Sequence, residues 1–438
     1  MQNLIHGAFR VNPRNPAGEK ENIFFSTSNV RKTPQKGSLA SMKTKIGLLL
    51  CLTLTFCIPK HQVSQQNWFK GNLHTHSYWS DGDDYPEMVM DWYKSNGYDF
   101  VSLSEHNVIA EGEKWKLIPK SRVHEEAFQK YLEKYGEEWV NFKEDTGRIS
   151  VKLKTLNEYR KLFDASGEFL ILQAEEITDR FDGKPLHLNA NNLQELIPPQ
   201  GGNSVTEVLQ NNINTVIEQR ARLGVPIMVH VNHPNFGYAI TVEDLIPVRG
   251  ERFFEVYNGH AAVNNRGDSA HISTEQMWDL INSARIKSGD ALLFGLATDD
   301  AHNYHLFGSS YSNAGRGWVM VNCDELTPET LINAMEAGQF YSTTGVILKK
   351  LTFEDNLLSI AIRPESDVTY EFEFIGQFAG ESPKILHRQS ATEVQYQLTE
   401  DVEYVRARIT SSKLMENPVY EKEQEMAWTQ PVRFTSSN

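Results

Sequence analysis

Histidine and acidic side chains gather in three short segments of the sequence, each placed where an apolar run ends. These segments are His74-Thr75-His76, Ser104-Glu105-His106 and Asp300-Ala301-His302. In an extended chain, side chains two residues apart point to the same face, so His74 and His76 are expected to face one site. Imidazole and carboxylate groups are ligands for zinc, manganese and iron. The pattern therefore predicts a metal site suited to hydrolytic chemistry.

Alternating strands and helices are expected to bring these segments together. Apolar runs typical of strands cover residues 68–74, 98–104, 169–174, 226–231, 253–257, 292–297 and 318–321. Helical patterns lie between Pro86 and Gly97, over 205–223 and over 328–337. Strand–helix–strand units imply parallel pairing, and the carboxyl ends of parallel strands meet at one edge, where α/β enzymes keep their chemistry.

Length and composition indicate a globular protein with room for two domains. The chain has 438 residues, of which 40% are hydrophobic and 23% charged, and its formal net charge is -14. This charge argues against a nucleic-acid-binding surface, which needs clustered Lys and Arg. An acidic protein that handles a small anionic substrate needs a local positive charge, and bound metal ions would supply it.

The region before residue 67 has the pattern of an export signal. Residues 1–41 are polar, without periodicity, and are interpreted as a disordered or non-native leader. In segment 42–60, Lys43 and Lys45 precede an apolar run that is too short to span a bilayer, which is typical of a secretory signal. Two outcomes stay open for a periplasmic or extracellular protein, namely simple cleavage or a lipoprotein attached to the membrane through Cys57. Beyond this segment only Cys323 remains, which excludes an intramolecular disulfide in the mature chain.

Two further regions depart from the strand–helix rhythm. Residues 111–165 are rich in Lys and Glu and are expected to form an inserted helical cap, although a merely solvated face is equally compatible with the pattern. From residue 347 to 438 the apolar period changes to two, as in Leu358, Ile360 and Ile362. With no intervening helix, this change predicts a small antiparallel β-sandwich.

The candidate metal ligands, taken in chain order, are His74, His76, Asp81, His106, Glu176, His187, His233, Asp300 and His302. Glu175 competes with Glu176, and Asp299 with Asp300, because strand alternation directs only one of each pair to the site. The Asp-x-His spacing between Asp300 and His302 favours Asp300 over Asp299. His230 is expected to pack or to support a ligand, and Glu255 and Asn258 are equally compatible with supporting or structural roles. His260, His271 and His305 are left without a role.

This ordered series resembles the polymerase and histidinol phosphatase (PHP) superfamily of metal-dependent phosphoesterases. The likeness covers residues 67–346 and rests on Asn72-Leu73-His74-Thr75-His76-Ser77, Ser80-Asp81-Gly82, Ser104-Glu105-His106-Asn107, Gln173-Ala174-Glu175-Glu176, Asn232-His233-Pro234 and Asp299-Asp300-Ala301-His302. It implies a distorted (βα)7 barrel with two or three divalent ions (Zn, Mn or Fe). By this resemblance, one ion takes His74, His76, Glu176 and Asp300. A second shares Glu176 and adds His187 and His233, and a third takes Asp81, His106 and His302.

The chemistry expected from this resemblance is hydrolysis of phosphate monoesters or diesters by a hydroxide that bridges two ions. Glu176 would bridge the ions, and Asp300 or a neighbouring His would carry the proton for the leaving group. Arg180, Lys184 and Arg316 are candidates for holding substrate oxygens. Two other functions stay open. Ala427-Trp428-Thr429-Gln430-Pro431 resembles a stretch of the carbaryl-hydrolase-like branch, which implies attack on carboxylic esters, carbamates or amides, and the β-domain alone is compatible with a non-catalytic surface- or carbohydrate-binding protein.

Overall fold

The computed structural model describes residues 66–163 and 167–436 of the chain. The predicted leader (1–41), the predicted signal segment (42–60) and Cys57 lie outside these residues. Within them, no helix is both long and apolar enough to cross a bilayer.

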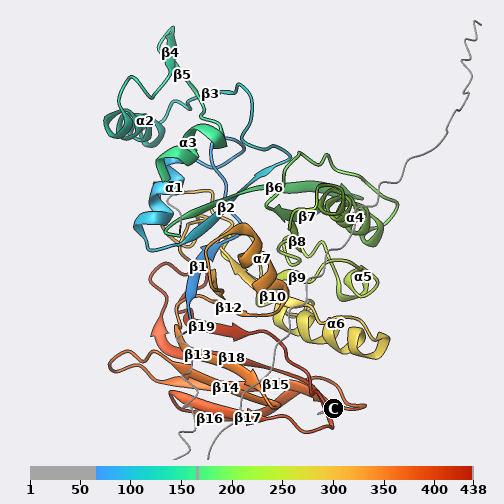
Figure 1. Cartoon of the computed structure of the whole chain (residues 1–438). Coiled ribbons are helices and arrows are strands. Elements are labelled where there is room, and N and C mark those ends of the chain that lie inside the picture. Colours follow the sequence, from blue (N-terminus) through green and yellow to red (C-terminus); the bar gives the residue numbers. More distant parts are fainter. Residues whose placement is uncertain (1–65, 164–166, 437–438) are drawn as a thin grey trace, which may run out of the picture. The chain divides into compact units, whose positions relative to one another are not determined.

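A mixed thirteen-stranded sheet organises the described chain (Figure 1). Its strand order is β10-β9-β8-β7-β6-β2-β1-β11-β12-β19-β18-β15-β16. The strands of its first part are β1 (Trp68–Asn72), β2 (Phe100–His106), β6 (Leu170–Phe181), β7 (Lys184–Asn191), β8 (Met228–Val231), β9 (Phe253–Asn258), β10 (Phe294–Thr298), β11 (Trp318–Asn322) and β12 (Phe340–Thr343).

Strand directions in this part are mixed, which corrects the expectation of uniformly parallel pairing. β1, β2 and β6 are parallel, as are β8, β9 and β10, but β7 runs antiparallel to β6 and β8, and β11 runs antiparallel to β1 and β12. β7 is a strand that the sequence analysis missed, and it forms a hairpin with β6. Side chains from strands that lie far apart in the strand order, such as Phe294 of β10, Leu172 of β6 and Phe340 of β12, meet in one buried cluster, so this part of the sheet curls round on itself. The mixed α/β class is confirmed, whereas the (βα)7 barrel remains an expectation.

Helices cover the outer face of the curled sheet, and their ends follow the sequence. The helices are α1 (Pro86–Ser95), α4 (Val205–Leu223), α5 (Val242–Leu245), α6 (Thr274–Ser288) and α7 (Pro328–Glu336). The α4 helix starts where the Ser204 side chain accepts a hydrogen bond from the Glu207 amide, and it ends at Gly224, which adopts the left-handed conformation. Its buried side chains Val208 and Ile213 pack in the same cluster as Leu188 of β7, and each such burial contributes about 1.5–3 kcal/mol.

The insertion contains more strand than predicted. It includes the helices α2 (Arg122–Tyr135) and α3 (Leu156–Phe163), but also the strands β3 (Trp115–Leu117), β4 (Phe142–Asp145) and β5 (Arg148–Lys152). These strands form a separate small sheet of order β3-β5-β4. The buried aromatic rings of Phe128 and Tyr131 on α2 belong to the same hydrophobic cluster as Tyr85 and Tyr93, which fastens the insertion to α1.

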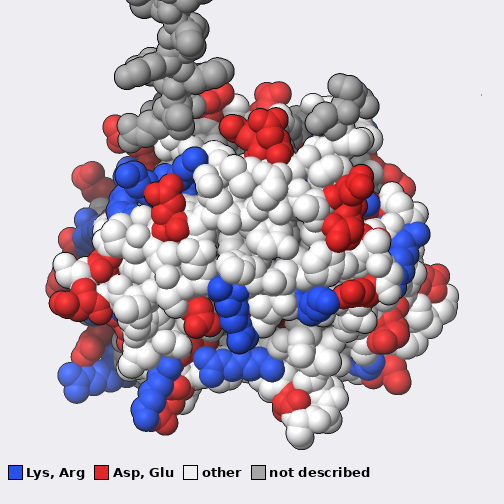
Figure 2. Space-filling view, turned by 90° about the horizontal axis from the view of Figure 1, so that it is seen from below, with Lys and Arg blue, Asp and Glu red and all other residues white. Residues whose placement is uncertain are grey.

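The C-terminal region folds as two antiparallel sheets packed face to face. Its strands are β13 (Leu348–Glu354), β14 (Leu357–Ile362), β15 (Tyr370–Phe378), β16 (Lys384–Ser390), β17 (Glu393–Gln397), β18 (Val402–Leu414) and β19 (Gln424–Thr429). One sheet has the order β13-β14-β17, and the other continues the large sheet, because β19 pairs with β12. Ile360 of the first sheet and Phe372 and Ala407 of the second meet in one core, so the predicted period of two produces the predicted sandwich. Seen from the side of these strands, the surface is largely uncharged with Lys, Arg and carboxylates spread around it (Figure 2).

Candidate metal centre

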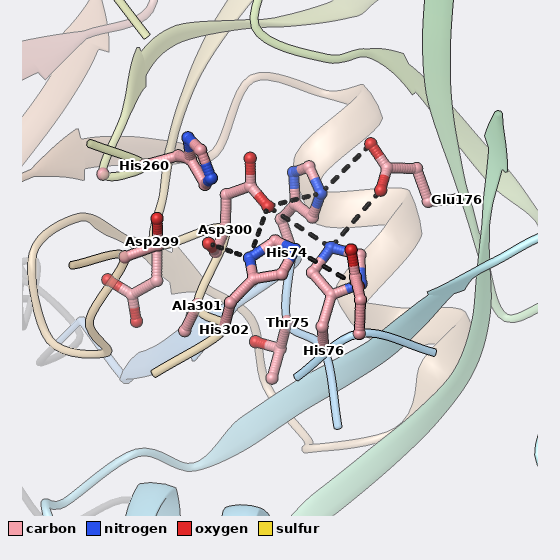
Figure 3. Close-up of polar contacts among 12 residues, drawn as sticks. His74, Thr75, His76, Glu176, His260, Asp299, Asp300, Ala301 and His302 are labelled. Carbon is pink, nitrogen blue, oxygen red and sulfur yellow. Dashed lines mark hydrogen bonds and ion pairs between the residues drawn. The ribbon is translucent and has the colours of Figure 1, made fainter. Parts of the chain in front are cut away.

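The His74-Thr75-His76 segment continues β1 and is held extended by backbone hydrogen bonds on both sides. The amide of Asp300 donates to the carbonyl of His74 (3.0 Å), and the amide of His76 donates to the carbonyl of Ala301 (3.0 Å). On the other side, the amide of Ser104 donates to the carbonyl of Thr75 (2.9 Å). This pairing aligns the three motifs found in the sequence, and it directs the His74 and His76 rings to one side, where Asp300 and Glu176 also point (Figure 3).

Asp299 and Asp300 point in different directions because the backbone turns between them. Asp300 has a φ of 49°, a left-handed conformation that Asp tolerates better than most residues. The Asp299 carboxylate turns away from the centre and accepts hydrogen bonds from the amides of Gly315, Arg316 and Gly317 (2.7–2.9 Å). Asp300 is therefore the carboxylate at the centre, and Asp299 anchors the following loop.

Four buried atoms converge at the centre without a hydrogen-bond partner among the described residues. They are His74 Nε2, His76 Nε2, Glu176 Oε2 and Asp300 Oδ1. Asp300 Oδ1 lies 3.2 Å from His74 Nε2 and 3.3 Å from His76 Nε2, and His76 Nε2 lies 3.3 Å from Glu176 Oε2. An ion about 2.0–2.1 Å from four tetrahedral ligands separates them by about 3.3–3.4 Å. Buried polar atoms without a hydrogen-bond partner are costly, so this donor set fits divalent cations. The ligand atoms of His74, His76 and Asp300 lie close enough together to share one ion, whereas Glu176 groups with His74 and His233.

Glu176 links this group to a second one through its other oxygen. Glu176 Oε1 lies 2.9 Å from His187 Nδ1 and 3.3 Å from His233 Nε2. It also accepts a hydrogen bond from Asn232 Nδ2 (2.8 Å). Glu175, the competing residue, points the other way and accepts a hydrogen bond from the amide of Ile197 (2.9 Å). Strand alternation in β6 thus places Glu176, and not Glu175, among the imidazoles.

A third group surrounds Asp81, which is the most exposed of the candidate ligands. Asp81 Oδ1 lies 3.3 Å from His302 Nε2 and 3.7 Å from His76 Nδ1, and Asp81 Oδ2 lies 3.5 Å from His106 Nε2. The Asp81 side chain is 56% exposed, so this group forms the solvent side of the centre. The grouping matches the predicted third set with the addition of His76.

All nine candidate ligands therefore fall into overlapping groups whose ligand atoms lie close together. The groups are His74-His76-Asp300, His74-Glu176-His233, His106-Glu176-His187 and His76-Asp81-His106-His302. The structure brings these residues together as the sequence predicted, and their role as ligands is taken up as a proposal below.

Behind the centre, Glu255 is the residue that orients His74. Its Oε1 lies 2.7 Å from His74 Nδ1 and accepts a hydrogen bond from the Thr298 hydroxyl (2.8 Å). Its Oε2 accepts from Asn258 Nδ2 (2.8 Å), which also donates to Asp300 Oδ2 (3.1 Å). His230 Nε2 lies 3.4 Å from the same carboxylate. Glu255, Asn258 and His230 thus support the ligands from a second layer of buried groups.

The electrostatics keep the central carboxyl groups ionised. Burial by itself would raise the pKa of Glu176, but the adjacent imidazoles, led by His106 and His74, lower that pKa well below its usual range. Burial by itself would also raise the pKa of Asp300, but the adjacent His74 lowers that pKa well below its usual range. Ionised carboxylates beside imidazoles are the form in which these groups bind a cation.

Of the three residues predicted to bind substrate, Arg316 does not lie where it could do so. Its side chain is fully buried, and its guanidinium donates to the carbonyls of Gly259, Tyr311, Gly308 and Asn417. These bonds tie the loop after β10 to the C-terminal region and leave Arg316 no role at the substrate. Arg180 and Lys184 are exposed near the tip of the β6–β7 hairpin, and their role stays a prediction.

The sequence analysis left His260 without a role, but the structure places it beside the centre. The His260 ring lies next to Asp300 (Figure 3), and its centroid is 5.3 Å from that of His302. The amide of Ala262 donates to His260 Nδ1 (3.1 Å), so the proton of the neutral ring resides on Nε2. The only signal in the sequence was its position two residues after the end of a strand that leads to this rim.

No described protein family and no curated protein matches this sequence. Among the solved structures that are similar are the following two. One is a two-domain protein from Bacteroides vulgatus that contains a predicted PHP-like metal-dependent phosphoesterase, with 13% identity, a TM-score of 0.38, and coverage of 85% of this chain and 96% of that one. The other, from Bifidobacterium adolescentis, is proposed to be a metal-dependent phosphoesterase, with 10% identity, a TM-score of 0.26, and coverage of 53% and 87%. Because both TM-scores are below 0.5, the centre is interpreted below from its own geometry.

Proposed function

We propose that this protein is a metal-dependent phosphoesterase that hydrolyses a small anionic substrate. The observation that carries the proposal is the convergence of His74 Nε2, His76 Nε2, Glu176 Oε2 and Asp300 Oδ1, four buried atoms without a hydrogen-bond partner among the described residues. The ligand atoms of His74, His76 and Asp300 lie close enough together to share one cation, and those of His74, Glu176 and His233 lie close enough to share another. Adjoining groups through Glu176 and Asp81 provide positions for one or two more ions. Several adjacent cations can hold the attacking and leaving oxygens of a phosphate ester in line, which favours this substrate class.

Zinc, manganese or iron ions suit these ligands, and when bound they would supply Lewis acidity, positive charge and a lowered pKa for water. The residues of the chain then hold the ligands in place. Glu255 accepts the Nδ1 proton of His74 and so leaves Nε2 free for a cation. Asn258 fixes Asp300 by donating to Oδ2. His260 presents its Nε2–H beside Asp300, where the neutral ring can donate a hydrogen bond to a substrate oxygen.

The same centre could attack carbon esters, carbamates or amides, so the test compares substrate classes. The full chain should be loaded separately with Zn, Mn and Fe, and its metal content measured by elemental analysis. We expect two or three ions per chain, turnover of p-nitrophenyl phosphate or bis-p-nitrophenyl phosphate, and loss of turnover after chelation. Turnover of p-nitrophenyl acetate or a carbamate, without turnover of either phosphate ester, would show that the protein hydrolyses carbon esters, carbamates or amides instead. Binding of less than one ion per chain would overturn both assignments.

We further propose that the protein acts outside the cytoplasm. The support is the basic and apolar pattern of segment 42–60, which lies outside the described residues. The measurement is the mass of the N-terminal peptide of protein recovered from fractionated cells. We expect a terminus near residue 60, or a lipid-bearing Cys57 in a membrane fraction. An intact cytoplasmic terminus at Met1 or Met42 would contradict export.

A further inference from the structure

Two lysines of the insertion reach the rim of the metal centre beside Asp81. The chain is extended from Lys114 through β3, because the Leu153 amide donates to the Lys114 carbonyl (2.9 Å) and Lys116 pairs with Val151 of β5. Side chains two residues apart in a strand share a face. Lys114 and Lys116 therefore extend to the same side, while Trp115 and Leu117 between and beyond them are exposed.

Consecutive backbone carbonyls hold the two ammonium groups close together. Lys114 Nζ donates to the carbonyl of Trp79, and Lys116 Nζ donates to that of Ser80 (3.3 Å). Lys116 Nζ also lies 4.8 Å from the ring centroid of Tyr78, which limits its movement. Burial lowers the pKa of Lys116, and the neighbouring charge of Lys114 lowers it further, which agrees with the proximity of the two groups.

Neither ammonium group forms an ion pair with a carboxylate in the described part of the chain. The carbonyls that hold them belong to the two residues directly before Asp81, and the Ser80 hydroxyl donates to Asp81 Oδ1 (3.2 Å). Two adjacent like charges repel each other, and the carboxylates of Glu105 and Asp81 offset the charge of Lys116 only from beyond ion-pair distance, so an anion bound between the two ammonium groups would be stabilised. An anion bound by the two lysines would therefore lie next to a substrate bound on the Asp81 side of the centre.

We propose that Lys114 and Lys116 form an anion subsite that binds a second acidic group of the substrate. This inference rests on the proposed phosphoesterase function and narrows its substrate class to phosphate esters that carry a further carboxylate or phosphate near the ester. Lysine suits this role because its ammonium is a compact point charge with three donors, of which one is already used by a carbonyl. The insertion then determines substrate preference, while the sheet carries the metal ligands.

The kinetic test compares two esters that differ in one acidic group. With the metal-loaded full chain, we expect kcat/KM for 3-phosphoglycerate to exceed that for glycerol 3-phosphate about tenfold or more. Lys116→Gln, which keeps a hydrogen-bond donor for the Ser80 carbonyl, should remove most of this preference, and Lys116→Arg should retain it. Lys120→Met removes an exposed lysine of the same insertion and should leave both values unchanged. Metal content should stay equal in all variants. Absence of a preference in the natural chain, or its survival in Lys116→Gln, would overturn the subsite.

A second measurement decides the matter without turnover. Acetylation of individual lysines by acetic anhydride should be followed by peptide mass spectrometry, with and without inorganic phosphate. Phosphate should slow the labelling of Lys114 and Lys116 several-fold but not that of Lys120. If the natural chain hydrolyses neither ester, the proposed function fails, while protection of the two lysines still supports the subsite. Equal labelling with and without phosphate would refute the subsite even in an active enzyme.

Discussion

His74 Nδ1 lies 2.7 Å from Glu255 Oε1, while Nε2 of the same ring faces the centre. Glu255 is fully buried, and the pKa of its carboxyl group, which burial would raise, is lowered below its usual range by His74. The ionised carboxylate accepts the Nδ1 proton and so determines the tautomer and the ring direction of His74. The direction of His74 Nε2 toward the other proposed ligands therefore depends on Glu255, which lies on the opposite side of the ring.

We expect Glu255→Gln to weaken metal binding about 10–100-fold. The amide can no longer select the His74 tautomer as a carboxylate does, although its volume is the same. Metal affinity should be measured by competition with a chromophoric chelator. Glu175→Gln is the matched control, because Glu175 is also buried on a strand of the sheet but accepts its hydrogen bond from the Ile197 amide. An unchanged metal affinity in Glu255→Gln would exclude this positioning role.

Glu175 itself should make stability depend on pH. Burial raises its pKa from the ordinary 4.5 to about 7. A carboxyl group whose pKa is higher in the folded state binds more protons there, so the free energy of unfolding falls as pH rises from about 4.5 to about 7. The shift corresponds to at most about 3 kcal/mol.

Glu175→Gln should remove this contribution. Urea denaturation of the variant between pH 4.5 and 8 should show a flatter profile than that of the natural chain, with the largest gain in stability above pH 7. Parallel profiles for the two proteins would mean that the buried carboxyl group is compensated by another group.

The sequence predicted which side chains come together better than it predicted the sheet that carries them. Strand alternation requires that only one of Glu175 and Glu176, and one of Asp299 and Asp300, face the site, and the spacing from Ala174 and to His302 favoured Glu176 and Asp300. β7 was missed although the Asp182-Gly183 dipeptide is a signal for a two-residue hairpin turn. In the structure these two residues have φ angles of 48° and 79°, as that turn requires. The structural role of Arg316 could not be predicted, because two of its partners, the carbonyls of Gly259 and Asn417, are more than 50 residues away, and no local pattern encodes such contacts.

Arg316→Met should lower the free energy of unfolding by about 3 kcal/mol or more. The change leaves the buried carbonyl of Gly259 and the partly buried carbonyls of Tyr311, Gly308 and Asn417 without their donor, and each buried unsatisfied group costs about 1–3 kcal/mol. Urea denaturation measures the effect. Arg180→Met, at an exposed position, should change stability by less than about 0.5 kcal/mol. Similar stabilities for the two variants would show that Arg316 does not fasten the C-terminal region.

His260→Phe should slow turnover without releasing metal. Burial lowers the pKa of His260 to about 4, so its ring is neutral at pH 7 and its proton is held on Nε2 by the bond from the Ala262 amide to Nδ1. Phenylalanine keeps the packing of the ring against Phe236 and His302 but has no N–H to donate in a hydrogen bond. Removal of one hydrogen-bond donor aimed at developing negative charge costs about 10²–10³-fold, so kcat should fall by about 10²-fold, with metal content and unfolding free energy unchanged. His271→Phe is the matched control, because His271 stacks on Tyr238 at an exposed position and should keep full activity. If kcat of His260→Phe equals that of the control, the His260 ring does not contact the reacting group.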